Sequence, residues 1–189
     1  MEAADPSSFI HLRVHTEYSL VDGLIDVKNL VKRARALGMP AIAVTDHLNL
    51  FALVKFYSAA LNEGIKPIAG ADVLISSTQE PQNPDALTLL VQNEEGYRTL
   101  SRLLTRAYRE NQHQGVPELR PEWLEKENLG LIALSGPHRG QIARASLASK
   151  PLQAEKIAAH WLSIFGDRLY LEIQRTGRPR EEQWIEAAM

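Results

Sequence analysis

Apolar side chains follow a helical period in one part of the chain and form a short continuous run in the next. Residues 27–37 repeat apolar positions three and four residues apart, which predicts an amphipathic helix. Asp26 precedes this helix as an N-cap, and Gly38 ends it. Residues 41–45 then form an apolar run typical of a buried strand in a parallel sheet. Together the two patterns predict a helix that leads into a buried strand.

The same patterns alternate along nearly the whole chain. We predict further helices that begin near Asn49, Asn93, Pro121, Gly140, Pro151 and Pro179, and further strands at residues 9–14, 66–76, 87–91, 129–134 and 168–174. Alternating strands and helices with short connections favour an α/β domain around a mostly parallel sheet, either open or closed into a barrel. Residues 77–85 are expected to form a surface loop, and residues 111–117 a polar loop.

The two ends of the chain differ from the part between them. Residues 1–8 are polar and predict a flexible N-terminal segment. The helix expected from Pro179 continues its apolar stripe as far as Met189 without a C-cap. We therefore expect one domain over residues 9–189 that is incomplete at its C-terminal end.

The composition excludes several kinds of site and several classes of protein. The 189 residues include no cysteine, which excludes a disulfide framework, a thiolate zinc site and a cysteine nucleophile. The formal net charge of -2 gives no global electrostatic case for nucleic-acid binding. The sequence has no secretory signal and no apolar stretch long enough to span a membrane. We expect a cytoplasmic protein with no membrane contact.

Three polar side chains alternate along the first predicted strand. Residues two apart in a strand share a face, so His11, Arg13 and His15 point the same way. Such side chains are costly to bury without partners. The face therefore either lines a polar cavity or belongs to a solvated edge strand.

Carboxylates and a further imidazole occur where apolar runs end or are interrupted. His47 follows Asp46 directly after the strand at residues 41–45, and Asp72 lies inside the next strand. Together with His15 and Asp22 they are ligands of the type that suits zinc, manganese or iron. The alternatives are a simple turn at Asp22 and a bulge or edge position at Asp72.

Two helices carry rows of basic side chains. Lys28, Lys32, Arg33 and Arg35 lie in the first helix, and Arg102, Arg106 and Arg109 recur at helical spacing in a later one. We interpret both rows as solvated faces.

Several motifs match a known family. Residues 11–19, HLRVHTEYS, resemble the opening motif of PHP domains (polymerase and histidinol phosphatase). Further segments are similar to the alpha subunits of bacterial DNA polymerase III: LVDGL at 20–24, GMPA at 38–41, LVKFY at 53–57, GIKPI at 64–68, NEEGYR at 93–98, LSG at 134–136 and YLEI at 170–173. The resemblance covers residues 9–189.

The resemblance implies a PHP domain at the N-terminus of a replicative catalytic subunit, folded as a distorted (β/α) barrel with a mostly parallel sheet. The magnesium-binding acids for nucleotidyl transfer would lie beyond residue 189, so no catalytic residue is expected within this chain. Implied partners are the proofreading exonuclease subunit and the rest of the polymerase III holoenzyme, with DNA reached through the parent protein.

The resemblance also identifies positions that hold metal in other PHP domains. His15, Asp22 and His47 match ligand positions, and Asp72 stands where a glutamate is usual. Arg13 stands where the family's first motif normally supplies a histidine. Ala86 replaces another histidine, and Pro137 lies near a position that often carries a cysteine.

Arg13 changes the electrostatics of such a site because a guanidinium stays charged and cannot ligate a cation. At about 5 Å and an effective dielectric constant of about 20, it opposes a divalent ion by about 7 kcal/mol. We hypothesise that Arg13 replaces the metal and pairs with Asp22 or Asp72. No cofactor is expected, although the retained ligands leave room for residual zinc or manganese binding.

Three functions follow from these observations. The first is a scaffold with a degenerate metal site that supports the polymerase and binds the exonuclease subunit. The second is an active metal-dependent phosphoesterase or 3′–5′ exonuclease, which requires ligands that positions 13, 86 and 137 lack. The third is a free-standing PHP phosphatase, which the polymerase-type segments disfavour.

Overall fold

A computed structural model describes residues 9–20, 22–77, 82–136 and 140–189. The expected flexible segment at residues 1–8 and the position of Pro137 lie outside the described residues. The chain divides into two compact units, Met1–Asp72 and Val73–Met189, and each is described by itself.

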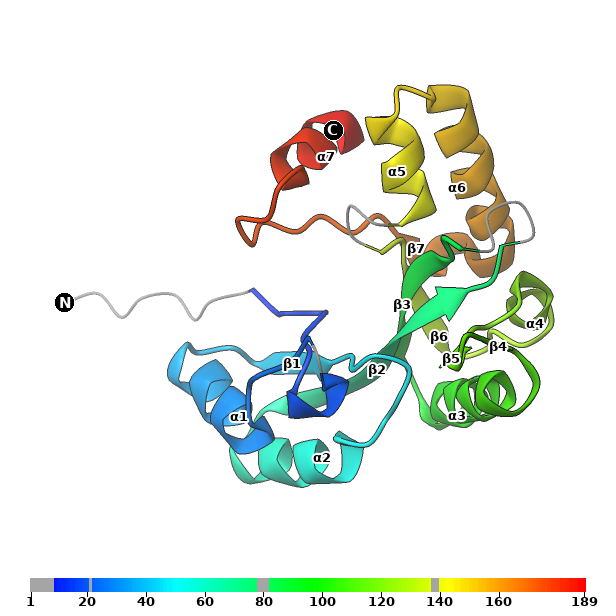
Figure 1. The fold of residues 1–189 in the computed structure, drawn as a ribbon. Coiled ribbons are helices and arrows are strands. Elements are labelled where there is room, and N and C mark those ends of the chain that lie inside the picture. Colours follow the sequence, from blue (N-terminus) through cyan, green and yellow to red (C-terminus); the bar gives the residue numbers. More distant parts are fainter. Residues whose placement is uncertain (1–8, 21, 78–81, 137–139) are drawn as a thin grey trace. The chain divides into compact units, whose positions relative to one another are not determined.

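In the first unit, two strands pair and two helices pack beside them (Figure 1). Its elements are α1 (Val27–Ala36), β1 (Ala41–Val44), α2 (Leu53–Asn62) and β2 (Lys66–Ile75), which continues past the unit boundary. β1 and β2 pair in parallel, with Ala41 opposite Lys66 and Val44 opposite Ala69. The apolar faces of α1 and α2 pack together with residues of β1 in one core, which includes Val31, Ile42 and Phe56.

The sequence predicts the start of α1 correctly, but its predictions for the elements before and after that helix need correction. The Asp26 side chain accepts a hydrogen bond from the Asn29 N–H at 3.0 Å, which confirms the predicted N-cap. The strand predicted at residues 9–14 is absent. These residues run beside β1, but a bend at Leu12 interrupts the regular hydrogen-bond pattern that a strand requires. The second helix was predicted to begin at Asn49 and begins instead at Leu53, because the Asn49 side chain closes a turn with the Phe51 N–H.

The second unit alternates strands and helices over the rest of the chain (Figure 1). Its elements are β3 (Asp85–Val91), α3 (Glu94–Glu110), β4 (Gln112–His113), β5 (Val116–Pro117), α4 (Pro121–Lys126), β6 (Leu131–Leu134), α5 (Gln141–Leu147), α6 (Pro151–Phe165), η2 (Gly166–Arg168), β7 (Leu169–Tyr170) and α7 (Glu181–Ala188). β3 pairs antiparallel with β6, and β6 pairs parallel with β7.

Capping again explains where α3 begins. The Asn93 side chain accepts from the Gly96 N–H at 3.0 Å, as its place in the sequence predicts. Gly130 has a φ of +72° and approaches this helix end so closely that a Cβ would lie 2.4 Å from the Asn93 Oδ1. Only glycine fits this contact without displacing the cap.

Two predictions in the second unit need correction. The loop expected at residues 111–117 contains the short hairpin of β4 and β5. The last predicted strand, residues 168–174, is reduced to Leu169–Tyr170, because only two residues pair with β6 before the chain leaves the sheet.

The α/β class is confirmed, with parallel pairing of β1 with β2 and of β6 with β7. Among the described residues no closed barrel is present, so the distorted barrel implied by the resemblance stays a prediction. Within the same residues, none of the helices combines the length and apolar character that crossing a bilayer requires.

Candidate functional site

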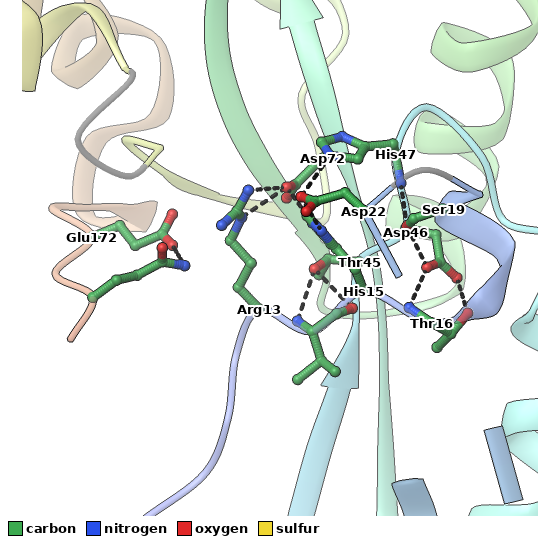
Figure 2. Close-up of polar contacts among 12 residues, drawn as sticks. Arg13, His15, Thr16, Ser19, Asp22, Thr45, Asp46, His47, Asp72 and Glu172 are labelled. Carbon is green, nitrogen blue, oxygen red and sulfur yellow. Dashed lines mark hydrogen bonds and ion pairs between the residues drawn. The ribbon is translucent and has the colours of Figure 1, made fainter. Parts of the chain in front are cut away.

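The predicted polar residues of the first unit gather around the carboxylate of Asp72 (Figure 2). The Arg13 Nε donates to Asp72 Oδ2 at 2.7 Å, and the Arg13 Nη2 forms an ion pair with the same oxygen. The His15 Nε2 lies 2.7 Å from this oxygen as well. Asp72 is only 6% exposed, so a guanidinium and an imidazole converge on a buried carboxylate.

Backbone pairing brings these side chains together from three parts of the sequence. Residue 47, just beyond β1, forms a parallel bridge with Asp72 of β2. The Leu48 N–H donates to the Asp72 carbonyl at 2.8 Å. On the other side of β1, the N–H groups of Ala43 and Thr45 donate to the carbonyls of residues 11 and 14. The extended segment therefore carries Arg13 and His15 alongside β1, towards Asp72.

The two imidazoles lie against each other and share a second carboxylate. The ring centroids of His15 and His47 are 4.4 Å apart, with planes inclined by 49°. The Asp22 Oδ2 lies 3.3 Å from His15 Nδ1 and 3.6 Å from His47 Nε2. Asp22 and His47 are partly exposed, whereas His15 is held between two carboxylates.

Asp46 fixes the loops that carry the imidazoles. This carboxylate is 1% exposed and accepts three hydrogen bonds: from the Thr16 N–H at 2.6 Å, the Thr16 hydroxyl at 2.7 Å and the Ser19 hydroxyl at 2.6 Å. The Ser19 oxygen in turn accepts from the His47 N–H at 3.2 Å. The short helix η1 (Glu17–Ser19) is thereby tied to the end of β1, which sets the positions of His15 and His47.

The neighbouring charges shift three pKa values. Burial alone would raise the pKa of Asp72, but the hydrogen bond from His15 and the charge of Arg13 hold it below its usual range. Burial alone would lower the pKa of His15, but the hydrogen bond to Asp72 and the Asp72 charge raise it. For His47, burial together with the charges of His15 and Arg13 outweighs Asp72 and lowers the pKa. The site thus favours the ionised form of Asp72, and Asp72 in turn favours the protonated form of His15.

His15, His47 and Asp72 supply donor atoms that all lie within 4.8 Å of one another, which is the composition of a transition-metal site. However, Asp72 Oδ2 is engaged by both Arg13 and His15 Nε2, so neither donor faces an ion freely. An ion bound to this oxygen would also lie beside the guanidinium, which repels it. In the arrangement observed, a divalent metal at these donors would have to displace Arg13 from Asp72 Oδ2.

Not every predicted residue belongs to this cluster. His11 is exposed, and its ring contacts Phe9 with centroids 4.9 Å apart, so the predicted common face of three residues holds only for Arg13 and His15. Ala86 lies in β3 of the second unit, where its N–H donates to Asp85 Oδ1. Pro137 falls outside the described residues.

Sequence reasoning gave no role to Thr16 and Ser19, and noted Asp46 only as the neighbour of His47. A signal was present, because Thr16 caps the short helix η1 and Ser19 ends it, and hydroxyls at helix ends commonly bond nearby groups. Their bond to Asp46 spans about thirty residues, so no local pattern predicts it.

Solved structures with the same fold have different activities in their names. A protein from Bifidobacterium adolescentis, named for metal-dependent phosphoesterase activity, superposes with a TM-score of 0.63 at 13% identity and covers 97% of this chain and 84% of its own. An amidohydrolase from Chromobacterium violaceum superposes with a TM-score of 0.54 at 14% identity, covering 94% and 96%. At such identities the likeness shows the fold alone.

Curated relatives are much closer in sequence. The DNA polymerase III alpha subunit of Pseudomonas fluorescens is 48% identical over 185 residues, and that of Escherichia coli K12 is 43% identical over 181. These alignments cover 97% and 96% of this chain but only 16% of each relative. The PHP domain family matches residues 11–176, a range that includes every member of the Asp72 cluster. The chain belongs to the PHP domain family.

Proposed function

We propose that this chain is the PHP-domain portion of a bacterial DNA polymerase III alpha subunit. Identities of 40–48% to proteins of that name, over nearly the whole chain, support this assignment. The chain corresponds to 16% of those proteins, so nucleotidyl transfer, with its magnesium ions, belongs to other parts of the parent polymerase. As part of a replicative subunit, the domain would work in the cytoplasm.

Within the polymerase, the domain acts as a scaffold in which an organic cation replaces metal. The observation that carries this proposal is the Arg13 guanidinium on Asp72 Oδ2, the oxygen that a metal would otherwise take. The pair satisfies a buried carboxylate without a metal ion. It joins the segment before η1 to β2 across 59 residues of sequence. A cluster of this kind braces loops and needs no proton transfer or redox step.

The scaffold would present surfaces to the other subunits of the replicase. We propose the proofreading exonuclease subunit as its direct partner, and DNA as the substrate of the parent protein. A test is co-elution of the purified 189-residue chain with that exonuclease subunit in size-exclusion chromatography. Two separately eluting proteins at micromolar concentration would contradict this partner assignment and leave the metal-site proposal unchanged.

Isothermal titration calorimetry with zinc and with manganese tests the replacement of metal by Arg13. We expect no stoichiometric high-affinity binding to the wild-type chain, because the ion would have to displace Arg13 from Asp72. The variant Arg13→His removes the repulsion but should still bind weakly, since positions 86 and 137 supply no ligand. Tight, stoichiometric binding to the wild-type chain would refute the proposal.

A second candidate is an active metal-dependent phosphoesterase or 3′–5′ exonuclease. The observation in its favour is the approach of three donor atoms, from His15, His47 and Asp72, to within 4.8 Å. It predicts manganese-dependent hydrolysis of bis-p-nitrophenyl phosphate that disappears in His15→Ala. The scaffold proposal predicts no such hydrolysis above the His15→Ala background, so one assay separates the two functions.

A further inference from the structure

Helix α1 presents a row of cations to solvent. It carries Lys28, Lys32, Arg33 and Arg35 and no acidic residue. Lys28, Lys32 and Arg35 follow one another at spacings of four and three residues, which places them on one side of the helix, and all three are exposed. We call these three residues the α1 basic row; it extends about 10 Å along the helix axis.

The acidic side chains of the first unit are already engaged elsewhere. Within residues 9–20 and 22–72 they bond as follows: Glu17 with Lys55, Asp22 with His15, Asp26 with the Asn29 N–H, Asp46 with Thr16 and Ser19, Glu63 with Arg35, and Asp72 with Arg13. Lys28 and Lys32 therefore have no acidic partner among the described residues. Arg35 keeps 60% of its side chain exposed; its Nε lies 3.7 Å from Glu63 Oε2, and its Nη1 donates to the Glu63 carbonyl.

Three of the four arginines of α3 show the opposite arrangement, whereas Arg109 has no ion pair among the described residues. Arg98 pairs with Glu94, Arg102 with Glu127 at 3.3 Å, and Arg106 with Glu110 at 2.9 Å. Arg106 also lies over the Trp123 ring, 4.2 Å from its centroid. These three arginines of α3 are thus neutralised within the fold, whereas Lys28 and Lys32 of the α1 basic row have no ion pair among the described residues. Two adjacent exposed lysines without an internal ion pair are complementary to an external polyanion.

We propose that the α1 basic row binds the phosphodiester backbone of DNA. This inference rests on the proposed function, because DNA is the polyanion that a polymerase subunit handles. The row matches the length of about three phosphates of one strand, which follow at about 3.4 Å along the duplex axis. Lysine ammonium groups act as point charges on phosphates and read no base, so the contact is independent of sequence. The contact would position the DNA without distinguishing one base sequence from another.

The matched test compares Lys28→Gln/Lys32→Gln in α1 with Arg98→Gln/Arg102→Gln in α3. Both double variants remove two exposed cations four residues apart and lower the net charge equally. Binding of fluorescein-labelled oligothymidylate and of a labelled duplex to the 189-residue chain is followed by fluorescence anisotropy over a range of salt concentrations. Circular dichroism and thermal unfolding check that each variant remains folded, as expected for exposed glutamine substitutions.

We expect the α1 variant to lose about tenfold or more in DNA affinity at low salt, with the slope of log K against log salt reduced by about 1.5. The α3 variant should change affinity by less than about twofold, because its cations are already neutralised. The single-strand and duplex arms show which form of the backbone is bound, and binding of either supports the proposal.

Three results would overturn the proposal: absence of DNA binding by the wild-type chain, equal losses in the two double variants, or preferential binding of labelled polyglutamate, which would assign the row to an acidic protein. None of these results affects the metal titration, which involves no DNA. Failure of the DNA contact is therefore distinguishable from failure of the proposed scaffold function.

Discussion

Asp72 in the first unit and Asp85 in the second are both carboxylates buried in strands, and their surroundings act on them in opposite directions. Asp72 faces the guanidinium of Arg13 and the imidazole of His15. Asp85 is 1% exposed and accepts from the N–H groups of Ala86 at 2.8 Å and Gln141 at 2.6 Å. The first carboxylate is matched by charged side chains and the second by backbone dipoles.

The pKa values follow from this difference. The hydrogen bond from His15 and the charge of Arg13 hold the pKa of Asp72 below its ordinary value, although burial alone would raise it. For Asp85, burial raises the pKa, and the amides of Gln141 and Ala86 with the more distant charge of Arg144 offset only part of this effect. Asp85 Oδ1 accepts a hydrogen bond from the N–H of Gln141, the first residue of α5, and so caps this helix from a distant part of the sequence. A neutral side chain with an acceptor oxygen can provide the same cap. Asp72 has a role that depends on its charge.

The largest expected effect is on stability and comes from Asp72→Asn. The substitution leaves the Arg13 guanidinium, which is only 15% exposed, without its carboxylate. An uncompensated buried charge costs about 3–5 kcal/mol of unfolding free energy. Urea denaturation of the 189-residue chain, followed by circular dichroism, measures this loss.

Asp85→Asn is the matched control for that substitution, because it makes the same chemical change at an equally buried position. The amide oxygen of asparagine can keep both backbone hydrogen bonds, so the expected loss at neutral pH is about 1 kcal/mol. Equal losses at the two positions would show that burial alone, and not the Arg13 charge, distinguishes Asp72.

A smaller effect is expected when both members of the ion pair are replaced. Arg13→Met alone should cost about 3–5 kcal/mol, since it removes the stronger cation beside Asp72. The double variant Arg13→Met/Asp72→Leu removes both charges and should recover to within about 1–2 kcal/mol of the wild type, the remainder reflecting a His15 nitrogen left without its acceptor. A double-mutant cycle in urea measures the coupling. Additive losses would mean that Arg13 and Asp72 do not act as a pair.

The smallest effect is a pH dependence at Asp85. The folded state holds the Asp85 proton more tightly than the unfolded chain, whose carboxyl has the ordinary pKa of 3.8. The stabilising contribution of the protonated form is complete below that value and is lost as the pH rises through the raised pKa. The unfolding free energy of the wild type, minus that of Asp85→Asn, should therefore fall as the pH increases above 3.8. Urea denaturation at several pH values tests the sign, and a rising difference would contradict it.

The sequence predicted the parts of the fold that depend on neighbours along the chain. The N-caps of α1 and α3 involve residues three apart, and both are confirmed. Predictions failed where a local signal was overridden. Asn49 has a side chain that commonly caps helices, but here its Nδ2 donates to the carbonyls of Tyr18 and His47. Because this side chain is engaged there, α2 begins later, at Leu53.

For the candidate site, residue types and motif resemblance were sufficient to select Arg13, His15, Asp22, His47 and Asp72 as interacting residues. They left open which carboxylate pairs with Arg13, and they gave no role to the Asp46 network. Only the register of β1 with β2 places Asp72 beside residue 47 and within reach of Arg13, 59 residues earlier in the chain. Spacing along a sequence determines contacts over a few residues, because the geometry of a helix or turn is local. Contacts across a sheet depend on how distant strands align, and the tertiary structure alone decides that alignment.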